Sequence, residues 1–159
     1  MTSPHLFGQL IQLGYVVTDF DQAAVKFRER YGIDKWKVVP LGPGSASSRI
    51  AMAYVGDVIF ELVEVDLSVE LMDIHRGWLP ADPSEARFNH VAFMLDSLEI
   101  WQDAQEQFRS EGVSIPVSMS FGDVYEFFYA DTVAQLGHWS EFICLKPGGK
   151  DFMADIPRF

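Results

Sequence analysis

The chain has 159 residues and a mass of 18.0 kDa, which suits one compact domain or two fused modules of half that size. Its 12 Lys and Arg residues against 23 Asp and Glu residues give a formal net charge of −11, so we expect neither nucleic acid nor a membrane surface as a partner. A single cysteine, Cys144, and no apolar run of the roughly 18 residues that a membrane span needs predict a reduced, cytoplasmic protein without a signal peptide.

The first half of the chain reads as a strand, a helix and three further strands. The run 10–17 has the apolar character of a strand. Asp19 stands three residues before Gln22, which is a capping-box spacing, so we expect a helix that starts there and stops at Gly32. Three further strands are predicted at 37–39, 50–55 and 59–65.

The second half repeats this order after a linker over residues 67–87. Within the linker we expect a short helix from residue 68 to about residue 78. A strand over 88–95 is followed by Asp96, three residues before Glu99, which predicts a second helix that starts at Asp96 and stops at Gly112. The remaining predicted strands are 113–119, 124–129 and 139–145, and residues 147–159 form a C-terminal tail.

Sequence similarity between the two halves supports an internal repeat. The strand around Gln12 matches the strand around His90, and the strand around Glu61 matches the strand around Glu141. A module of this size buries its sheet poorly alone, so the two modules should pack or pair through their sheets. We therefore predict an α+β fold of two tandem βαβββ modules, over residues 7–66 and 88–146.

Four polar side chains stand where strand alternation predicts an apolar face. They are Gln12 and His90 on the first strand of each module, and Glu61 and Glu141 on the last. An unpaired buried carboxylate costs roughly several kcal/mol, and two together raise the pKa of at least one of them. One divalent cation (Zn, Ni, Co or Mn) would balance the two charges and accept all four donors. The alternative is that a carboxylate is hydrogen-bonded locally and the cavity holds no metal.

Large apolar side chains on or near the same strands are candidates for contact with a hydrophobic ligand. The alternative is that they are only core, because strand parity does not separate the two roles. The candidates are Trp139, Phe88, Met94, Phe127 and Tyr129. Two further histidines, His75 and His138, are interpreted as solvated surface residues, and Cys144 as a structural or surface thiol without a partner that would activate it.

The ordered set of motifs resembles the vicinal oxygen chelate superfamily, which includes glyoxalase I, methylmalonyl-CoA epimerase, extradiol dioxygenases and bleomycin-resistance proteins. The motifs are QLGYVVTD at 12–19, FELV at 60–63, NHVAF at 89–93 and GHWSEF at 137–142. The resemblance spans residues 7–146. It implies the glyoxalase/bleomycin-resistance fold, a paired, curved mixed sheet around a central cavity, and a homodimer.

The resemblance also implies a site. Gln12, Glu61, His90 and Glu141 match the ligand quartet of eukaryotic-type glyoxalase I, with Glu141 as the first catalytic base and Glu61 as the second. The implied function is a metal-dependent isomerase, epimerase or lyase that removes a proton next to a carbonyl group in a hydrophobic small molecule. Val16 stands where glutathione-binding glyoxalases carry an Arg, so glutathione thioethers are not supported. The acidic balance disfavours a CoA ester, and a single His disfavours dioxygen chemistry at Fe(II).

Two non-catalytic alternatives stay open. Some members of the superfamily sequester a hydrophobic aromatic compound without chemistry, and the 14% aromatic content of this chain suits that role. The other alternative is an interaction domain with a vestigial site, which would have neither metal nor pocket.

Overall fold

The protein is described by a computed structural model that covers residues 7–41, 48–66 and 70–159 and divides into two compact units. One unit comprises Gln12–Asn89 and Asp155–Phe159. The other comprises the described residues up to Ile11 together with His90–Ala154. Each unit therefore combines most of one predicted module with a segment from the opposite end of the chain.

The Gln12–Asn89 unit contains the βαβββ order predicted for the first module. Its sheet has the strand order β2-β3-β4-β1, with β1 parallel to β4 and the other pairs antiparallel. Its elements are β1 (Gln9–Val17), α1 (Phe20–Tyr31), β2 (Lys37–Pro40), β3 (Arg49–Val55) and β4 (Val58–Glu64). The linker helix η1 is a 3-10 helix over Glu70–Trp78, and the predicted start of that helix at residue 68 lies outside the described residues.

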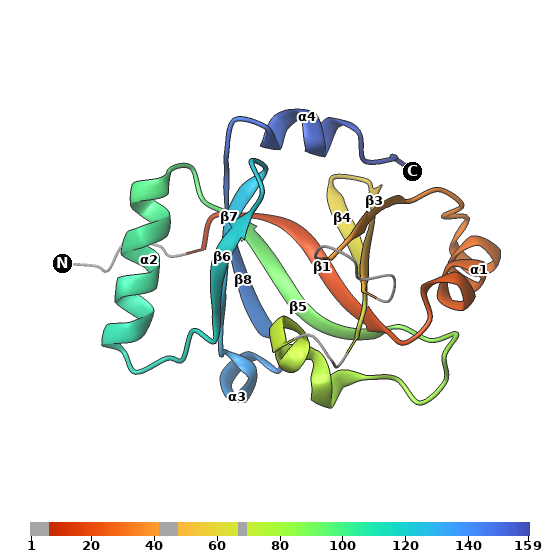
Figure 1. Cartoon of the computed structure of the whole chain (residues 1–159), viewed down its shortest axis with the longest axis horizontal. Helices are drawn as coiled ribbons and strands as arrows, with labels where there is room; N and C mark the ends of the chain where they lie inside the picture. Colours follow the sequence, from red (N-terminus) through yellow and green to blue (C-terminus); the bar gives the residue numbers. More distant parts are fainter. Residues whose placement is uncertain (1–6, 42–47, 67–69) are drawn as a thin grey trace. The chain divides into compact units, whose positions relative to one another are not determined.

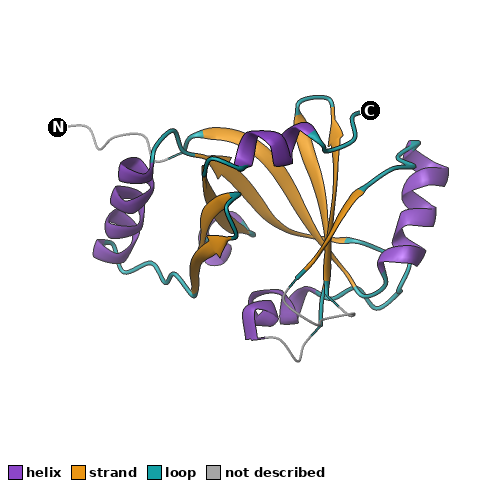
Figure 2. Cartoon of the chain, turned by 45° about the horizontal axis from the view of Figure 1, so that its top comes forward, coloured by secondary structure: helices purple, strands orange, loops and turns teal. Residues whose placement is uncertain are grey.

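Helix α1 starts and stops where its sequence predicts. The Gln22 backbone N–H donates to Asp19 Oδ1 at 3.0 Å, and Gly32 ends the helix with a φ of 74°, a conformation that favours glycine. Its buried residues Phe20 and Phe27 pack on one face of the sheet, against a cluster that includes Leu62. Figures 1 and 2 show α1 beside the strands of this sheet.

The unit with His90–Ala154 repeats the same topology. Its sheet has the order β5-β8-β7-β6, with β5 parallel to β8. Its main elements are β5 (Arg87–Met94), α2 (Leu98–Ser110), β6 (Val117–Phe121), β7 (Tyr125–Ala130) and β8 (Trp139–Leu145), and two short helices follow later strands, α3 (Val133–Leu136) and α4 (Gly149–Ala154). The predicted α+β class and its two βαβββ modules are confirmed.

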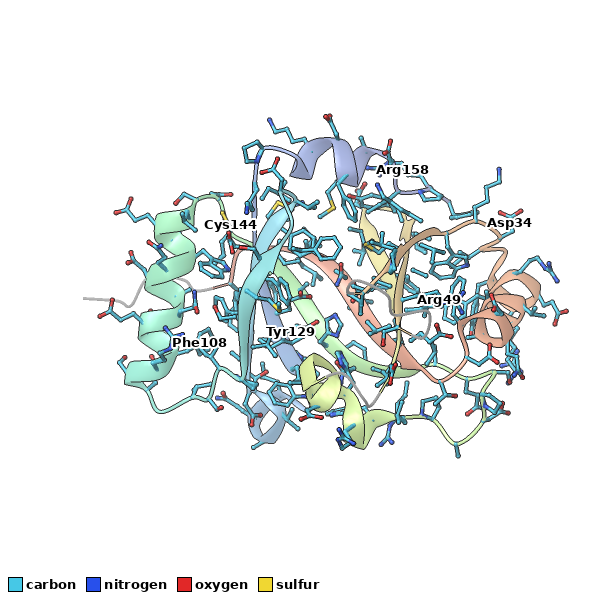
Figure 3. All side chains as sticks on the ribbon, viewed as in Figure 1. Asp34, Arg49, Phe108, Tyr129, Cys144 and Arg158 are labelled. Carbon is cyan, nitrogen blue, oxygen red and sulfur yellow. The ribbon has the colours of Figure 1, made fainter. Side chains whose placement is uncertain are left out.

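An aromatic core joins α2 to its sheet. Phe128 and Phe142 are both fully buried, and their rings stack with centroids 4.9 Å apart. Phe108 of α2 packs on Phe142 with centroids 5.3 Å apart, and its position on the helix is marked in Figure 3. The Trp101 indole N–H donates to the Phe142 carbonyl at 3.0 Å, which satisfies the polar atom of a buried ring.

Three sequence predictions about local structure are wrong. Helix α2 is capped by Ser97, whose Oγ accepts from the Ile100 N–H at 3.2 Å, and not by Asp96. Strand β6 begins at Val117 and not at residue 113, because the Val113 N–H closes the end of α2 by donating to Phe108 O at 2.9 Å. His75 lies within η1 and is only 2% exposed, so it is not a solvated surface residue.

None of the helices in the described part of the chain is long and apolar enough to cross a membrane.

Candidate functional site

His90 and Glu141 form a buried pair in the His90–Ala154 unit. In the parallel pairing of β5 with β8, Ala92 lies opposite Glu141 and His90 lies opposite Trp139, so His90 and Glu141 are on the same face of the sheet. They are 0% and 4% exposed. The distance from His90 Nε2 to Glu141 Oε2 is 3.4 Å, which brings an imidazole nitrogen and a carboxylate oxygen to one point.

Tyr129 joins this pair from the neighbouring strand. It lies opposite Glu141 in the antiparallel pairing of β7 with β8, and its side chain is buried. Its hydroxyl is 3.5 Å from His90 Nε2, and the two rings meet edge to face with centroids 5.2 Å apart. Figure 3 labels Tyr129 on the sheet. A phenol hydroxyl at this place can donate to an acceptor that lies beside the His90–Glu141 pair.

Four of the five predicted ligand-contacting residues share the face of His90. Phe127 and Tyr129 lie on β7 and are buried, while Trp139 and Met94 are half-buried on β8 and β5. Phe88 stands two positions before His90 on β5, but its ring packs edge-on against Tyr15 with centroids 5.7 Å apart. The face of His90 is therefore rich in aromatic and apolar side chains, as a site for an apolar ligand requires.

Gln12 and Glu61 hold the equivalent positions in the other unit. Gly14 lies opposite Glu61 in the parallel pairing of β1 with β4, so Gln12 and Glu61 are on one face of that sheet. They are 3% and 4% exposed. This register repeats that of β5 and β8, in which Ala92 lies opposite Glu141. Each module thus buries one amide or imidazole side chain on its first strand and one carboxylate on its last strand.

The chemistry of these side chains fits a divalent cation. Glu61, His90 and Glu141 each offer an oxygen or nitrogen atom of the kind that binds first-row metals, and all three are buried. The amide oxygen of Gln12 adds a neutral donor. Each carboxylate would bring one negative charge to a bound cation, and burial would exclude competing water.

A partly buried ion pair, which no sequence pattern predicts, lies at the start of α1. Arg49 donates from Nε to Glu64 Oε2 at 2.6 Å, and Glu64 also accepts from the Phe20 N–H at 3.0 Å. Burial acts to raise the pKa of Glu64, but these hydrogen bonds outweigh it and hold the pKa below its usual range. The pair anchors the start of α1 to β3 and β4, and Figure 3 marks Arg49 there. Only residues far apart in the sequence make it, so no local pattern predicts it.

Cys144 is a structural thiol. It is 6% exposed and packs in the aromatic core beneath α2, on the face of β8 opposite Glu141. Burial, with a smaller contribution from the Glu126 charge, raises the pKa of the thiol. A thiol with a raised pKa is a poor nucleophile, as the sequence analysis expected.

No protein-family model matches the sequence, and neither does any curated protein. Solved structures do match. Methylmalonyl-CoA epimerase from Mycobacterium tuberculosis superposes with a TM-score of 0.62 at 16% identity, over 97% of this chain and 97% of that one. A Streptomyces coelicolor methylmalonyl-CoA epimerase variant in complex with 2-nitronate-propionyl-CoA gives a TM-score of 0.59 at 17% identity, over 87% and 95% of the two chains.

A hypothetical protein from Bacillus halodurans C-125 also matches, with a TM-score of 0.58 at 17% identity, over 87% of this chain and 94% of that one. The two methylmalonyl-CoA epimerases have the fold that the sequence motifs of this chain imply. The chain has the vicinal oxygen chelate fold. At this level of identity the likeness shows the vicinal oxygen chelate fold alone, so the roles of Gln12, Glu61, His90 and Glu141 depend on their own burial and chemistry.

Proposed function

We propose that the protein is a divalent-metal-dependent isomerase or epimerase that removes a proton from the carbon next to a carbonyl group of an apolar small molecule. The observation that carries the proposal is the buried pair of His90 and Glu141, 3.4 Å apart, on an aromatic face of the sheet. Gln12 and Glu61 hold the equivalent register positions in the other module, and the proposal adds them to the ligand set.

Gln12, Glu61, His90 and Glu141 are the proposed metal ligands. The set has an amide oxygen, an imidazole nitrogen and two carboxylates, which suits Zn, Ni, Co or Mn. When bound, the cation supplies positive charge that polarises a carbonyl oxygen and so acidifies the neighbouring C–H group. Each carboxylate is buried, and a cation beside it would stabilise its charge.

Glu141 is the proposed general base. Its carboxylate takes the proton from the carbon next to the carbonyl, while His90 and the strand pairing with Ala92 hold it in place. Glu61, the equivalent residue of the other module, is the proposed second base; it would return to the same carbon a proton that it has taken from solvent, while the proton held by Glu141 passes to solvent. Return on the opposite face inverts that centre, and return at a neighbouring carbon gives an isomer. A substrate with a leaving group on the neighbouring carbon would instead undergo elimination, a lyase reaction.

The apolar side chains around His90 support a hydrophobic substrate. Phe127 and Tyr129 are buried, and Trp139 and Met94 are half-buried on the same face.

The same aromatic face also favours a second function, sequestration of a hydrophobic aromatic compound without chemistry. The two functions differ in one respect that is easy to measure, because only the enzyme exchanges the proton next to the carbonyl with solvent.

Proton exchange with deuterium oxide therefore tests the proposal. The probes are phenylpyruvate, an aromatic carbonyl compound, and methylmalonyl-CoA, the compound in the names of the structural neighbours. We expect the metal-loaded protein to accelerate deuterium uptake into at least one probe, as followed by NMR. Glu141→Gln keeps the shape of the side chain but removes the base, so the rate should fall by about 10² to 10⁴.

The matched control is Glu126→Gln, since Glu126 lies on β7 but pairs with Lys146 at 3.4 Å, away from His90. This variant should exchange at the wild-type rate. Unchanged exchange in Glu141→Gln contradicts the assignment of the base. A protein that exchanges neither probe, but binds phenylpyruvate in a way that Phe127→Ala weakens, is a sequestration protein that uses the face of His90.

A further inference from the structure

The Gln12–Asn89 unit has a cavity on the helix side of its sheet. Its volume is about 280 Å³, and its lining includes Tyr15, Lys26, Phe27, Arg30, Phe60 and Glu85. We call this space the α1 cavity. Because side chains alternate along a strand, Tyr15 and Phe60 lie on the face opposite Gln12 and Glu61. The α1 cavity is therefore separate from the residues proposed to bind metal.

Aromatic rings form the walls of the α1 cavity. Tyr15 and Phe60 lie on neighbouring strands with ring centroids 5.6 Å apart, and Phe27 meets Tyr31 edge to face at 5.4 Å. Pockets for drug-sized ligands have volumes of about 300 to 1,000 Å³, so a cavity of this size suits a smaller molecule with a single ring. Rings of this kind offer edge and face contacts to such a ligand.

Two cations from successive turns of α1 line the same space. Arg30 is exposed and makes no ion pair with any residue in the described part of the chain. Lys26 Nζ is 3.7 Å from Asp82 and 4.0 Å from Glu85, distances that are too long for hydrogen bonds, and both acids are more than half exposed. Lys26 is thus shared between two acids, and Arg30 is the cation of this space that has no carboxylate partner among the described residues. One such guanidinium beside two acids suits a monoanion better than a phosphate or a dicarboxylate.

The Tyr15 hydroxyl adds a donor. Burial, with a smaller contribution from Tyr31, raises the pKa of Tyr15 above its ordinary value of 10.0. The phenol therefore keeps its proton at neutral pH and can donate to an anionic oxygen.

We propose that the α1 cavity binds a single-ring aromatic monocarboxylate, with the ring between Tyr15 and Phe27 and the carboxylate on Arg30 and Lys26. A planar guanidinium binds a carboxylate through two parallel hydrogen bonds, which makes Arg30 the main anchor. The site is additional to the proposed metal site and does not depend on its activity.

Isothermal titration calorimetry with benzoate tests this proposal on the whole chain, in the presence of excess EDTA so that no metal contributes. We expect saturable binding of one benzoate per chain, and at least tenfold weaker binding of benzyl alcohol, which keeps the ring but lacks the charge, and of terephthalate, which adds a second negative charge. Arg30→Gln should weaken benzoate binding by about tenfold or more. Tyr15→Phe, which keeps the ring and removes the hydroxyl, should weaken it several-fold.

Arg28→Gln is the matched control, because Arg28 is an exposed cation on the same helix that does not line the cavity. It should bind benzoate as the wild type does. The proposal is overturned if benzoate shows no saturable binding, if Arg30→Gln and Arg28→Gln weaken it equally, or if Glu141→Gln abolishes it, since the last result would place benzoate at the other site.

Discussion

At the scale of single residues, Glu64 is the clearest case of a buried charge that the fold compensates. It is 8% exposed and accepts hydrogen bonds from the Arg49 guanidinium and from the first N–H of α1. The Arg49 guanidinium also lies over the Phe20 ring, 5.2 Å from its centroid. A buried charge with this many partners is costly to disrupt, because removal of one partner leaves the other unpaired.

Glu64→Gln should therefore lower the free energy of unfolding by about 2 to 4 kcal/mol at pH 7, as measured by denaturant titration. The folded pKa of Glu64 is lowered, so its contribution is complete above the unfolded pKa of about 4.3 and is lost as the pH falls through the folded pKa. The difference between wild type and variant should thus narrow in acid. Glu29→Gln, an exposed change on α1, should stay within about 0.5 kcal/mol of the wild type at every pH. A constant difference from pH 7 to pH 3 would contradict this account.

Strand alternation predicted the inward face of Gln12, Glu61, His90 and Glu141 from sequence, and their burial confirms it. Alternation succeeds here because each strand is regular and each polar residue has apolar neighbours two positions away. It could not predict the approach of Tyr129 to His90, which depends on the register between strands. Whether the four residues bind metal stays a prediction.

At the scale of elements, the C-terminal segment extends the sheet of the Gln12–Asn89 unit. The Tyr54 N–H donates to Pro157 O at 2.8 Å, and the Phe159 N–H donates to Tyr54 O at 3.0 Å. The Arg158 guanidinium lies over the Tyr54 ring, 3.9 Å from its centroid. Ile156 is 2% exposed. The segment therefore covers part of β3 that β2 does not reach, since β2 pairs only with residues 49–52.

Ile156→Ala should lower the free energy of unfolding by about 2 to 4 kcal/mol, because it removes buried methyl groups and leaves a cavity. Phe159→Ala is the comparison, since that ring is 45% exposed and its backbone hydrogen bonds remain. It should cost less than about 1 kcal/mol. Equal losses for the two variants, measured by chemical denaturation, would show that the segment is not docked as described.

Long elements with caps and clear periodicity were predicted well, and irregular ones were not. Helix α1 begins after Asp19 and ends at Gly32, as predicted. At the start of α2, Asp96 and Ser97 are both good capping residues, and the sequence alone did not show which of them caps the helix. The linker helix was predicted, but its 3-10 geometry was not, and with it the burial of His75. Tertiary packing decides such segments.

At the scale of the whole molecule, the repeat explains why a chain with a net charge of −11 buries two acidic residues at matched positions. Each module supplies one amide or imidazole side chain and one carboxylate in the same register, Gln12 and Glu61 in one module and His90 and Glu141 in the other. The predicted homodimer, the cytoplasmic location and the module boundaries stay predictions. The vicinal oxygen chelate fold was recognisable from four short motifs because they occur in a fixed order on corresponding strands.

The most direct test of the account is the metal content of the protein purified without chelator, measured by inductively coupled plasma mass spectrometry. We expect about one divalent ion per chain in the wild type and in the surface control Glu29→Gln. Glu61→Gln and Glu141→Gln should each lose most of it, because each removes one charged ligand from a different module. A wild type that stays metal-free after incubation with Zn²⁺, Ni²⁺, Co²⁺ or Mn²⁺, or variants that retain the full metal content, would contradict the proposed site.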